Sequence, residues 1–242
     1  MKRVFSTLAI VLTINTFSFS QDLPSVEQVL DKYVAAIGGK DALAKIQDVT
    51  ISSTTETPRG VSETEIKFKM PNKYFMSSYA NGMELFSVIC DGNKLVRKSS
   101  FGRGGEQPPK EGKEAQAEAI MSNPFAEANY IAAGVTGVVQ GIEKVGDKDA
   151  YKVEFTGLTG NKFTTFFDKE SGLKVKSLMT MEMMGQKMES SVRYEDYKKF
   201  KGTEVLVPAK TTRSGGRMGE IVAEVQSVKI NKGLEDKVFE IK

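Results

Sequence analysis

The sequence predicts a mainly β fold of the α+β class, in which an antiparallel sheet curves around a few helices. Most of the chain after residue 48 alternates apolar and polar residues with a period of two, which is typical of strands with one buried face. Turn residues such as Gly, Asn and Pro separate these segments at short intervals. Strands and helices do not alternate as they would in βαβ units. The pattern therefore favours antiparallel pairing.

The first twenty residues have the pattern of a secretory signal peptide. A basic start and an apolar stretch at 4–17 precede the small-x-small motif Ser18-Phe19-Ser20. The apolar stretch is shorter than the roughly 20 residues that a membrane-spanning helix needs. We therefore expect residues 1–20 to be a cleaved signal peptide and residues 21–242 to form a single domain. The mature protein is expected to be periplasmic or secreted, with no integral membrane segment.

Composition argues against several classes of function. The chain contains no histidine, which removes His-based zinc sites and the Ser-His-Asp and Cys-His arrangements of many hydrolases. Its 34 basic and 31 acidic residues are interleaved, so the net charge of +3 does not indicate a nucleic-acid partner. The one cysteine, Cys90, has no partner for an internal disulfide. We predict a protein that is not an enzyme and uses no cofactor or metal.

Three segments have helical patterns. The first begins with the capping box Ser25-x-x-Gln28, continues with apolar residues at helical spacing and ends at Gly38-Gly39. A short helix is expected at 41–46, and residues 113–122 have helical composition. Because an amphipathic helix must bury its apolar stripe, we expect these helices to lie against the sheet.

Strand patterns occur in two runs, one before and one after the helix predicted at 113–122. The first run covers about residues 49–100 and the second about residues 135–230. Residues 101–112 are rich in Gly and Pro and are predicted to form an exposed loop. No stretch of low complexity separates the two runs, so both are assigned to one domain.

Two strands carry apolar faces that are candidates for a ligand site. In the second run the apolar set consists of Val175, Ser177, Met179, Met181 and Met183. The alternating polar set, expected to face water, consists of Lys174, Lys176, Thr180 and Glu182. In the first run, Ile66, Phe68 and Met70 share one side of a strand. Methionine is flexible and polarizable, so this composition suits either an irregular core or a pocket for a flexible apolar ligand.

Several motifs resemble those of one known family. They are Tyr33–Leu43, Phe167–Val175, Tyr194–Tyr197, Gly202–Pro208 and Val228–Phe239. In this order they resemble the LolA/LolB-like superfamily, the periplasmic lipoprotein-sorting carriers and their relatives. The resemblance implies a half-open antiparallel β-barrel of about eleven strands, with helices covering the concave face. In the characterised carriers this face receives acyl chains.

The apolar faces and the resemblance lead to a hypothesis about the ligand site. The residues expected to line it are Ile66, Phe68, Met70, Met179, Met181, Met183 and Met188. The expected ligand is a lipid or lipoprotein acyl chain or another apolar molecule, in a protein of outer membrane biogenesis. An alternative remains open, in which these side chains fill the barrel themselves. The protein would then be a structural module, or one that docks an envelope protein partner.

Overall fold

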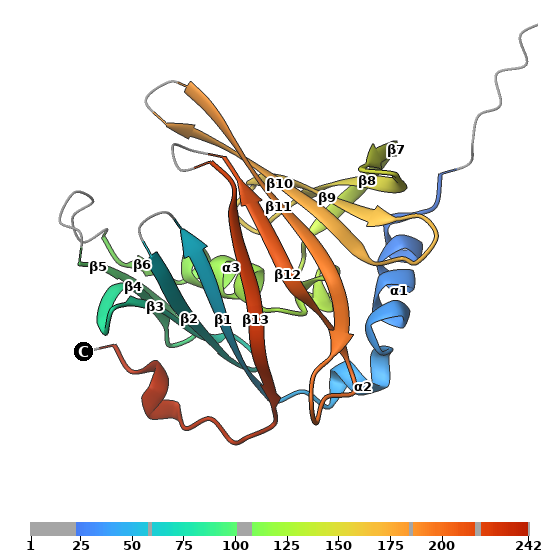
Figure 1. Cartoon of the computed structure of the whole chain (residues 1–242). Helices are drawn as coiled ribbons and strands as arrows, with labels where there is room; N and C mark the ends of the chain where they lie inside the picture. Colours follow the sequence, from blue (N-terminus) through green and yellow to red (C-terminus); the bar gives the residue numbers. More distant parts are fainter. Residues whose placement is uncertain (1–22, 58–59, 101–107, 184–185, 216–218, 242) are drawn as a thin grey trace, which may run out of the picture.

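The computed structural model describes residues 23–57, 60–100, 108–183, 186–215 and 219–241. Within these residues, thirteen strands form one sheet in the order β6-β5-β4-β3-β2-β1-β13-β12-β11-β10-β9-β8-β7. The sheet curls into a half-open barrel, with β6 and β7 at its two edges (Figure 1). The predicted mainly β fold is thus confirmed. The expected signal peptide, residues 1–20, lies outside the described residues.

The first run of strands forms one half of the sheet. It consists of β1 (Asp48–Thr57), β2 (Gly60–Lys69), β3 (Lys73–Ala80), β4 (Met83–Cys90), β5 (Lys94–Ser99) and β6 (Lys110–Glu111). The short strand β6 lies in the stretch predicted to be a loop and pairs with β5 through Lys94 and Glu111. A two-residue strand is too short to show a periodic pattern, which is why the sequence did not indicate it.

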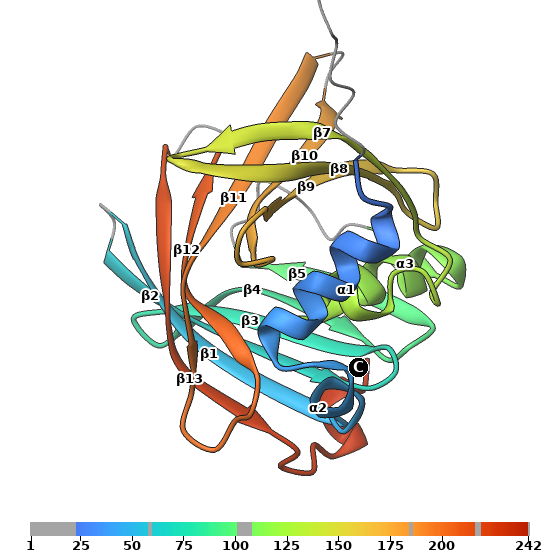
Figure 2. The ribbon, with the colours of Figure 1, turned by 90° about the vertical axis from the view of Figure 1, so that its right-hand side faces the viewer.

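The second run forms the other half. It consists of β7 (Thr136–Val145), β8 (Lys148–Thr156), β9 (Lys162–Asp168), β10 (Lys174–Met183), β11 (Gln186–Lys199), β12 (Leu206–Ser214) and β13 (Ile221–Ile230). The two halves join where β1 pairs antiparallel with β13. One sheet therefore contains strands from both sides of the central helical segment, as Figure 2 also shows.

Helices α1 (Val26–Ile37) and α3 (Lys113–Ser122) lie inside the curl of the sheet (Figure 2). The chain also contains the short helix α2 (Lys40–Ala44) and the 3₁₀ turns η1 (Ala126–Asn129) and η2 (Asp236–Phe239). The predicted capping box is present: the Ser25 amide donates to Gln28 Oε1 at 2.8 Å, and the Gln28 amide donates to Ser25 Oγ at 3.3 Å. Within the described ranges, none of the helices is both long and apolar enough to cross a membrane.

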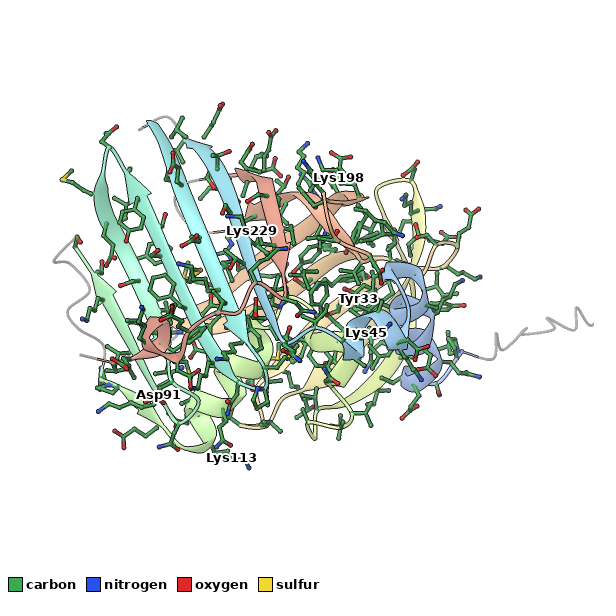
Figure 3. The ribbon with its side chains drawn as sticks, turned by 90° about the horizontal axis from the view of Figure 1, so that it is seen from below. Tyr33, Lys45, Asp91, Lys113, Lys198 and Lys229 are labelled. Atoms are coloured by element: carbon green, nitrogen blue, oxygen red, sulfur yellow. The ribbon has the colours of Figure 1, made fainter. Side chains whose placement is uncertain are left out.

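The core lies between the helices and the inner faces of both halves of the sheet. Tyr33 of α1 is buried and meets the ring of Phe167 edge-on, with 5.5 Å between ring centroids. In Figure 3, Tyr33 is seen inside the molecule beside its helix. Tyr130 packs in the same way on Phe155, which stacks on Phe163. Aromatic pairs of this kind add to the stability that burial alone supplies.

A buried aspartate organises the turn between β9 and β10. Asp168 is 4% exposed, and its Oδ1 accepts hydrogen bonds from the amides of Glu170 at 2.8 Å and Ser171 at 2.7 Å. Burial alone would raise the pKa of Asp168, but these amide donors, with Lys148 nearby, hold it below its ordinary value of 3.8. The carboxylate form therefore stabilises the turn from which β10 starts.

Candidate ligand site on the concave face

The concave face of β2 to β5 changes from closed core to open wall across three rows of side chains. The row packed deepest consists of Phe68, Tyr74, Cys90 and Leu95, none more than 6% exposed. The middle row consists of Ile66, Met76, Val88 and Arg97. The outer row consists of Thr64, Ser78, Phe86 and Ser99, in which Ser78 is buried and Phe86 is 37% exposed.

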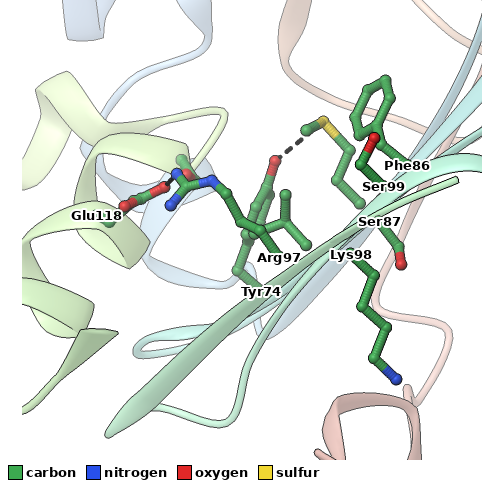
Figure 4. Close-up of a pocket in the computed structure, with 10 residues that line it drawn as sticks. Tyr74, Phe86, Ser87, Arg97, Lys98, Ser99 and Glu118 are labelled. Carbon is green, nitrogen blue, oxygen red and sulfur yellow. Dashed lines mark hydrogen bonds and ion pairs between the residues drawn. The ribbon is translucent and has the colours of Figure 1, made fainter. Parts of the chain in front are cut away.

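A cavity of about 450 Å³ opens over the middle and outer rows, and we name it the Arg97 cavity (Figure 4). It lies between β3, β4 and β5 on one side and α3 on the other. Its main side chains are Tyr74, Met76, Phe86, Val88, Arg97 and Ser122. The cavity thus combines an apolar wall with a few polar groups, as small-molecule sites commonly do.

The polar groups of the Arg97 cavity share one carboxylate. The Arg97 guanidinium pairs with Glu118 Oε1, and Glu118 Oε2 accepts a hydrogen bond from Lys110 Nζ at 2.8 Å. Two cations facing one anion leave an excess of one positive charge. Burial lowers the pKa of Arg97, although an arginine stays protonated at neutral pH.

The Tyr74 hydroxyl is a second polar group in this cavity. It donates a hydrogen bond to Met76 Sδ at 3.2 Å (Figure 4). A thioether sulfur is a weak acceptor, so this hydroxyl retains capacity for a better partner. Burial raises the pKa of Tyr74 to about 12, and the hydroxyl is therefore a donor at neutral pH.

A second cavity, the Glu127 cavity, lies on the other side of the end of α3 and measures about 240 Å³. Residues that line it include Met121, Tyr130, Phe163, Lys174, Leu178 and Met179. Glu127 Oε1 accepts a hydrogen bond from Lys174 Nζ at 2.5 Å, and the two side chains are only 5% and 12% exposed. Within the described residues, the buried Glu127 Oε2 has no hydrogen-bond partner.

The charged state of Lys174 is stabilised by its surroundings. Burial alone would lower the pKa of Lys174, but the carboxylate of Glu127, with nearby tyrosines, raises it well above its ordinary value. The Tyr194 ring adds a cation–π contact at 4.4 Å from Nζ. The Glu127–Lys174 pair is therefore nearly buried, whereas the Arg97–Glu118 pair is partly exposed and is shared with Lys110.

The position of Lys174 corrects the prediction that it faces water. β10 pairs with β9 through Lys174 opposite Phe167 and Ser177 opposite Thr165, with a β-bulge between Lys174 and Lys176. A bulge inserts one extra residue and shifts the alternation. Lys174 and Ser177, three residues apart, therefore both line the inner face. Strict alternation could not locate this shift.

The predicted site residues of the first run lie deeper than those of the second. Phe68 is 0% exposed and belongs to the closed core. Ile66 is partly buried and pairs with Met76, which lines the Arg97 cavity. Met70 follows β2 directly, packs on the core, and its Sδ accepts from Asn123 Nδ2 at 3.8 Å. Direct contact of these three residues with a ligand stays a prediction.

The predicted methionines of the second run lie toward the open end of the barrel. Met179 is 43% exposed and lines the Glu127 cavity, whereas Met188 is 36% exposed. Met181 pairs with Met188, and Met183 ends β10, but the side chains of Met181 and Met183 lie outside what the structure describes. A ligand-binding role for these four also stays a prediction.

Sequence reasoning missed the polar groups of both cavities. Arg97 follows Leu95 on the same strand face, and a cation on an otherwise apolar face was a usable signal. Glu118 and Glu127 gave no such signal, because their partners are distant in sequence and only the fold brings them together. No group of three or more metal-ligating side chains occurs within the part of the chain described here.

Comparison by sequence finds no matching protein-family model and no matching curated protein. Solved structures do match. A LolA superfamily protein from Nitrosomonas europaea aligns with a TM-score of 0.58 and 16% identity, over 90% of this chain and 99% of that one. A DUF1329 family protein from Desulfovibrio piger aligns with a TM-score of 0.52 and 15% identity, over 90% and 98% of the two chains.

A third match is a Vibrio parahaemolyticus protein domain provisionally assigned to outer membrane lipoprotein sorting. It aligns with a TM-score of 0.52 and 12% identity, over 89% of this chain and 95% of that one. At such identities a match establishes shared architecture and leaves function to be argued from the site. The fold of this chain is that of the LolA-like proteins.

Proposed function

We propose that this chain is a periplasmic or secreted, non-enzymatic carrier that binds a lipid acyl chain or another apolar ligand on the concave face of its half-barrel. The observation that carries this proposal is the Arg97 cavity. Its volume of about 450 Å³ falls within the roughly 300 to 1,000 Å³ typical of ligand sites. The match to a domain assigned to lipoprotein sorting favours an acyl chain as the ligand.

Binding would be driven by burial of hydrocarbon. Each methylene removed from water contributes about 0.8 kcal/mol. Met76 lines the Arg97 cavity and Met121 and Met179 line the Glu127 cavity. Because methionine adapts its shape at little cost, these residues suit a chain of variable conformation. The predicted lining residues Met181, Met183 and Met188 would extend this surface toward the open end.

Two observations support a role without catalysis. The chain has no histidine, and the carboxylates in the two cavities, Glu118 and Glu127, are each engaged by a cation. A nearby cation lowers the pKa of a carboxylate and so makes it a weaker general base. The proposal therefore assigns these groups to shaping and charging the cavities.

Native mass spectrometry of the full chain, extracted gently from its source, tests the proposal. We expect the folded protein to carry, or to take up from added decanoate, one acyl ligand. The variant Ser99→Trp should reduce uptake, because Ser99 lies on the outer row beside the cavity mouth. Lys94→Trp is the matched control, since Lys94 lies on the same strand and lines neither cavity.

Failure of the wild-type protein to hold any acyl ligand would contradict the carrier function. The structural or partner-docking alternative would then be the better account. Unchanged uptake by Ser99→Trp would show that the ligand lies elsewhere on the molecule.

A further inference from the structure

We propose that the Arg97 cavity recognises the carboxylate of a fatty acid, with the hydrocarbon lying against Met76, Phe86 and Val88. This inference rests on the proposed function, because it names the polar end of the apolar ligand. It goes further in assigning an orientation and a charge to that ligand.

The charges that meet at Glu118, which lines the cavity, favour a ligand with one negative charge. Arg97 and Lys110 both face Glu118, so two cations share a single carboxylate. The remaining positive charge matches one ionised carboxyl group. A phosphate monoester carries a charge of about −1.5 to −2 at neutral pH and would overcompensate it.

Two donors in the cavity are placed for such a group. A guanidinium has five N–H groups in a planar fork, and the one ion pair that Arg97 makes within the described residues is to Glu118. The Tyr74 hydroxyl donates to the Met76 sulfur and also interacts with Ser122. A carboxylate oxygen is a stronger acceptor than a thioether, so the hydroxyl gains a better partner when such a ligand binds.

The apolar wall gives the direction of the chain. Val88 pairs with Arg97 across β4 and β5, and Met76 pairs with Val88 across β3 and β4. Phe86, one row farther out, is 37% exposed and marks the open side. A carboxylate at Arg97 would therefore leave its hydrocarbon over a continuous apolar row.

The Glu127 cavity disfavours the same anion. Its lysine is already paired, and Glu127 Oε2 presents an unpartnered acceptor that would repel a carboxylate. The polar end of an anionic ligand consequently has one preferred location on the concave face.

Isothermal titration calorimetry of the full chain with decanoate, methyl decanoate and decyl phosphate tests the inference. We expect decanoate to bind at least about tenfold more tightly than its methyl ester, as charge-assisted hydrogen bonds suggest. Arg97→Met should abolish this preference while leaving affinity for the ester within about twofold. Glu118 retains Lys110 in this variant, so no uncompensated carboxylate remains.

Lys94→Met is the control, because it removes an equal charge from the same strand at a position that lines neither cavity. It should keep the preference for decanoate. If Arg97→Met fails to fold, Glu118→Gln provides a second test, since releasing Arg97 should strengthen decanoate binding.

The outcomes separate this inference from the function on which it rests. Equal affinity for decanoate and its ester, or tighter binding of decyl phosphate, would overturn carboxylate recognition while the carrier function stands. Absence of binding by all three compounds would overturn both.

Discussion

The two halves of the concave face use ion pairs in different ways. In the β9–β11 half, Glu127 and Lys174 are nearly sealed from solvent and pair with each other. In the β2–β5 half, Arg97 is about one-third exposed and shares Glu118 with Lys110 at the wall of a larger cavity. The two ion pairs therefore differ in solvent access: the Glu127–Lys174 pair is nearly buried, and the Arg97–Glu118 pair is partly exposed.

The largest expected effect on stability comes from replacing a predicted ligand residue that lies in the core, compared with one that lines a cavity. Phe68→Ala should lower the free energy of unfolding by about 4 kcal/mol, because Phe68 is fully buried. Met179→Ala should cost less than about 1 kcal/mol, since its side chain is 43% exposed. Chemical denaturation of both variants measures the difference. Similar losses would mean that the two residues do not differ in packing.

Breaking the buried ion pair should have the next largest effect. Lys174→Met leaves the Glu127 carboxylate buried without its cation, at a cost of about 3 kcal/mol. The double variant Glu127→Gln with Lys174→Met should recover most of this loss in urea unfolding, because no lone charge remains. No recovery would show that the lysine acts through packing alone.

The Glu127–Lys174 ion pair should make the free energy of unfolding depend on pH in the alkaline range. The pKa of Lys174 is raised in the folded protein, so its contribution is fully present below the ordinary value of 10.5 and is lost as pH rises through the folded value. Lys174→Met should remove this dependence. If the free energy of unfolding changed with alkaline pH equally in the wild type and in the variant, Lys174 would not be the source of the dependence.

The Asp168 turn, which leads into β10, should have a smaller effect. Asp168→Asn is expected to cost about 1 to 2 kcal/mol at neutral pH, because the ionised acceptor of two amide donors is lost. The folded pKa lies below 3.8, so this contribution is present above that pH and declines as pH falls through the folded value. Thermal unfolding between pH 3 and 7 should therefore converge for the two proteins at the acid end.

The smallest expected effect lies in the other half. Arg97→Met should change the free energy of unfolding by less than about 1 kcal/mol, since the pair is partly exposed and Lys110 stays with Glu118. Urea denaturation of this variant beside Lys174→Met gives the comparison directly. A loss as large as that of Lys174→Met would assign Arg97 to the fold.

Local signals in the sequence predicted much of the fold. The capping box at Ser25 and the period-two strands act over a few residues, and both occur as expected. The bulge beside Lys174 and the two-residue strand β6 have no periodic pattern of their own. The bulge depends on pairing with β9 and the short strand on pairing with β5, and a local sequence pattern does not indicate either pairing.

The site was less predictable than the fold. Met179 does line a cavity, as its strand face suggested. Phe68 had an equally apolar context but lies in the core, because burial depends on how far a row lies from the helices. The contact between Arg97 and Glu118 joins a strand to a helix across a stretch without periodicity. Only the folded chain reveals that contact.

The most direct test of ligand binding on the concave face is NMR of the methionine methyl groups in the full chain during titration with decanoate. Met76 lines the Arg97 cavity, whereas Met83 is 67% exposed and lines neither cavity. We predict that the Met76 resonance shifts saturably while that of Met83 does not. Unchanged Met76 and Met179 resonances at saturating decanoate would contradict a ligand site on this face.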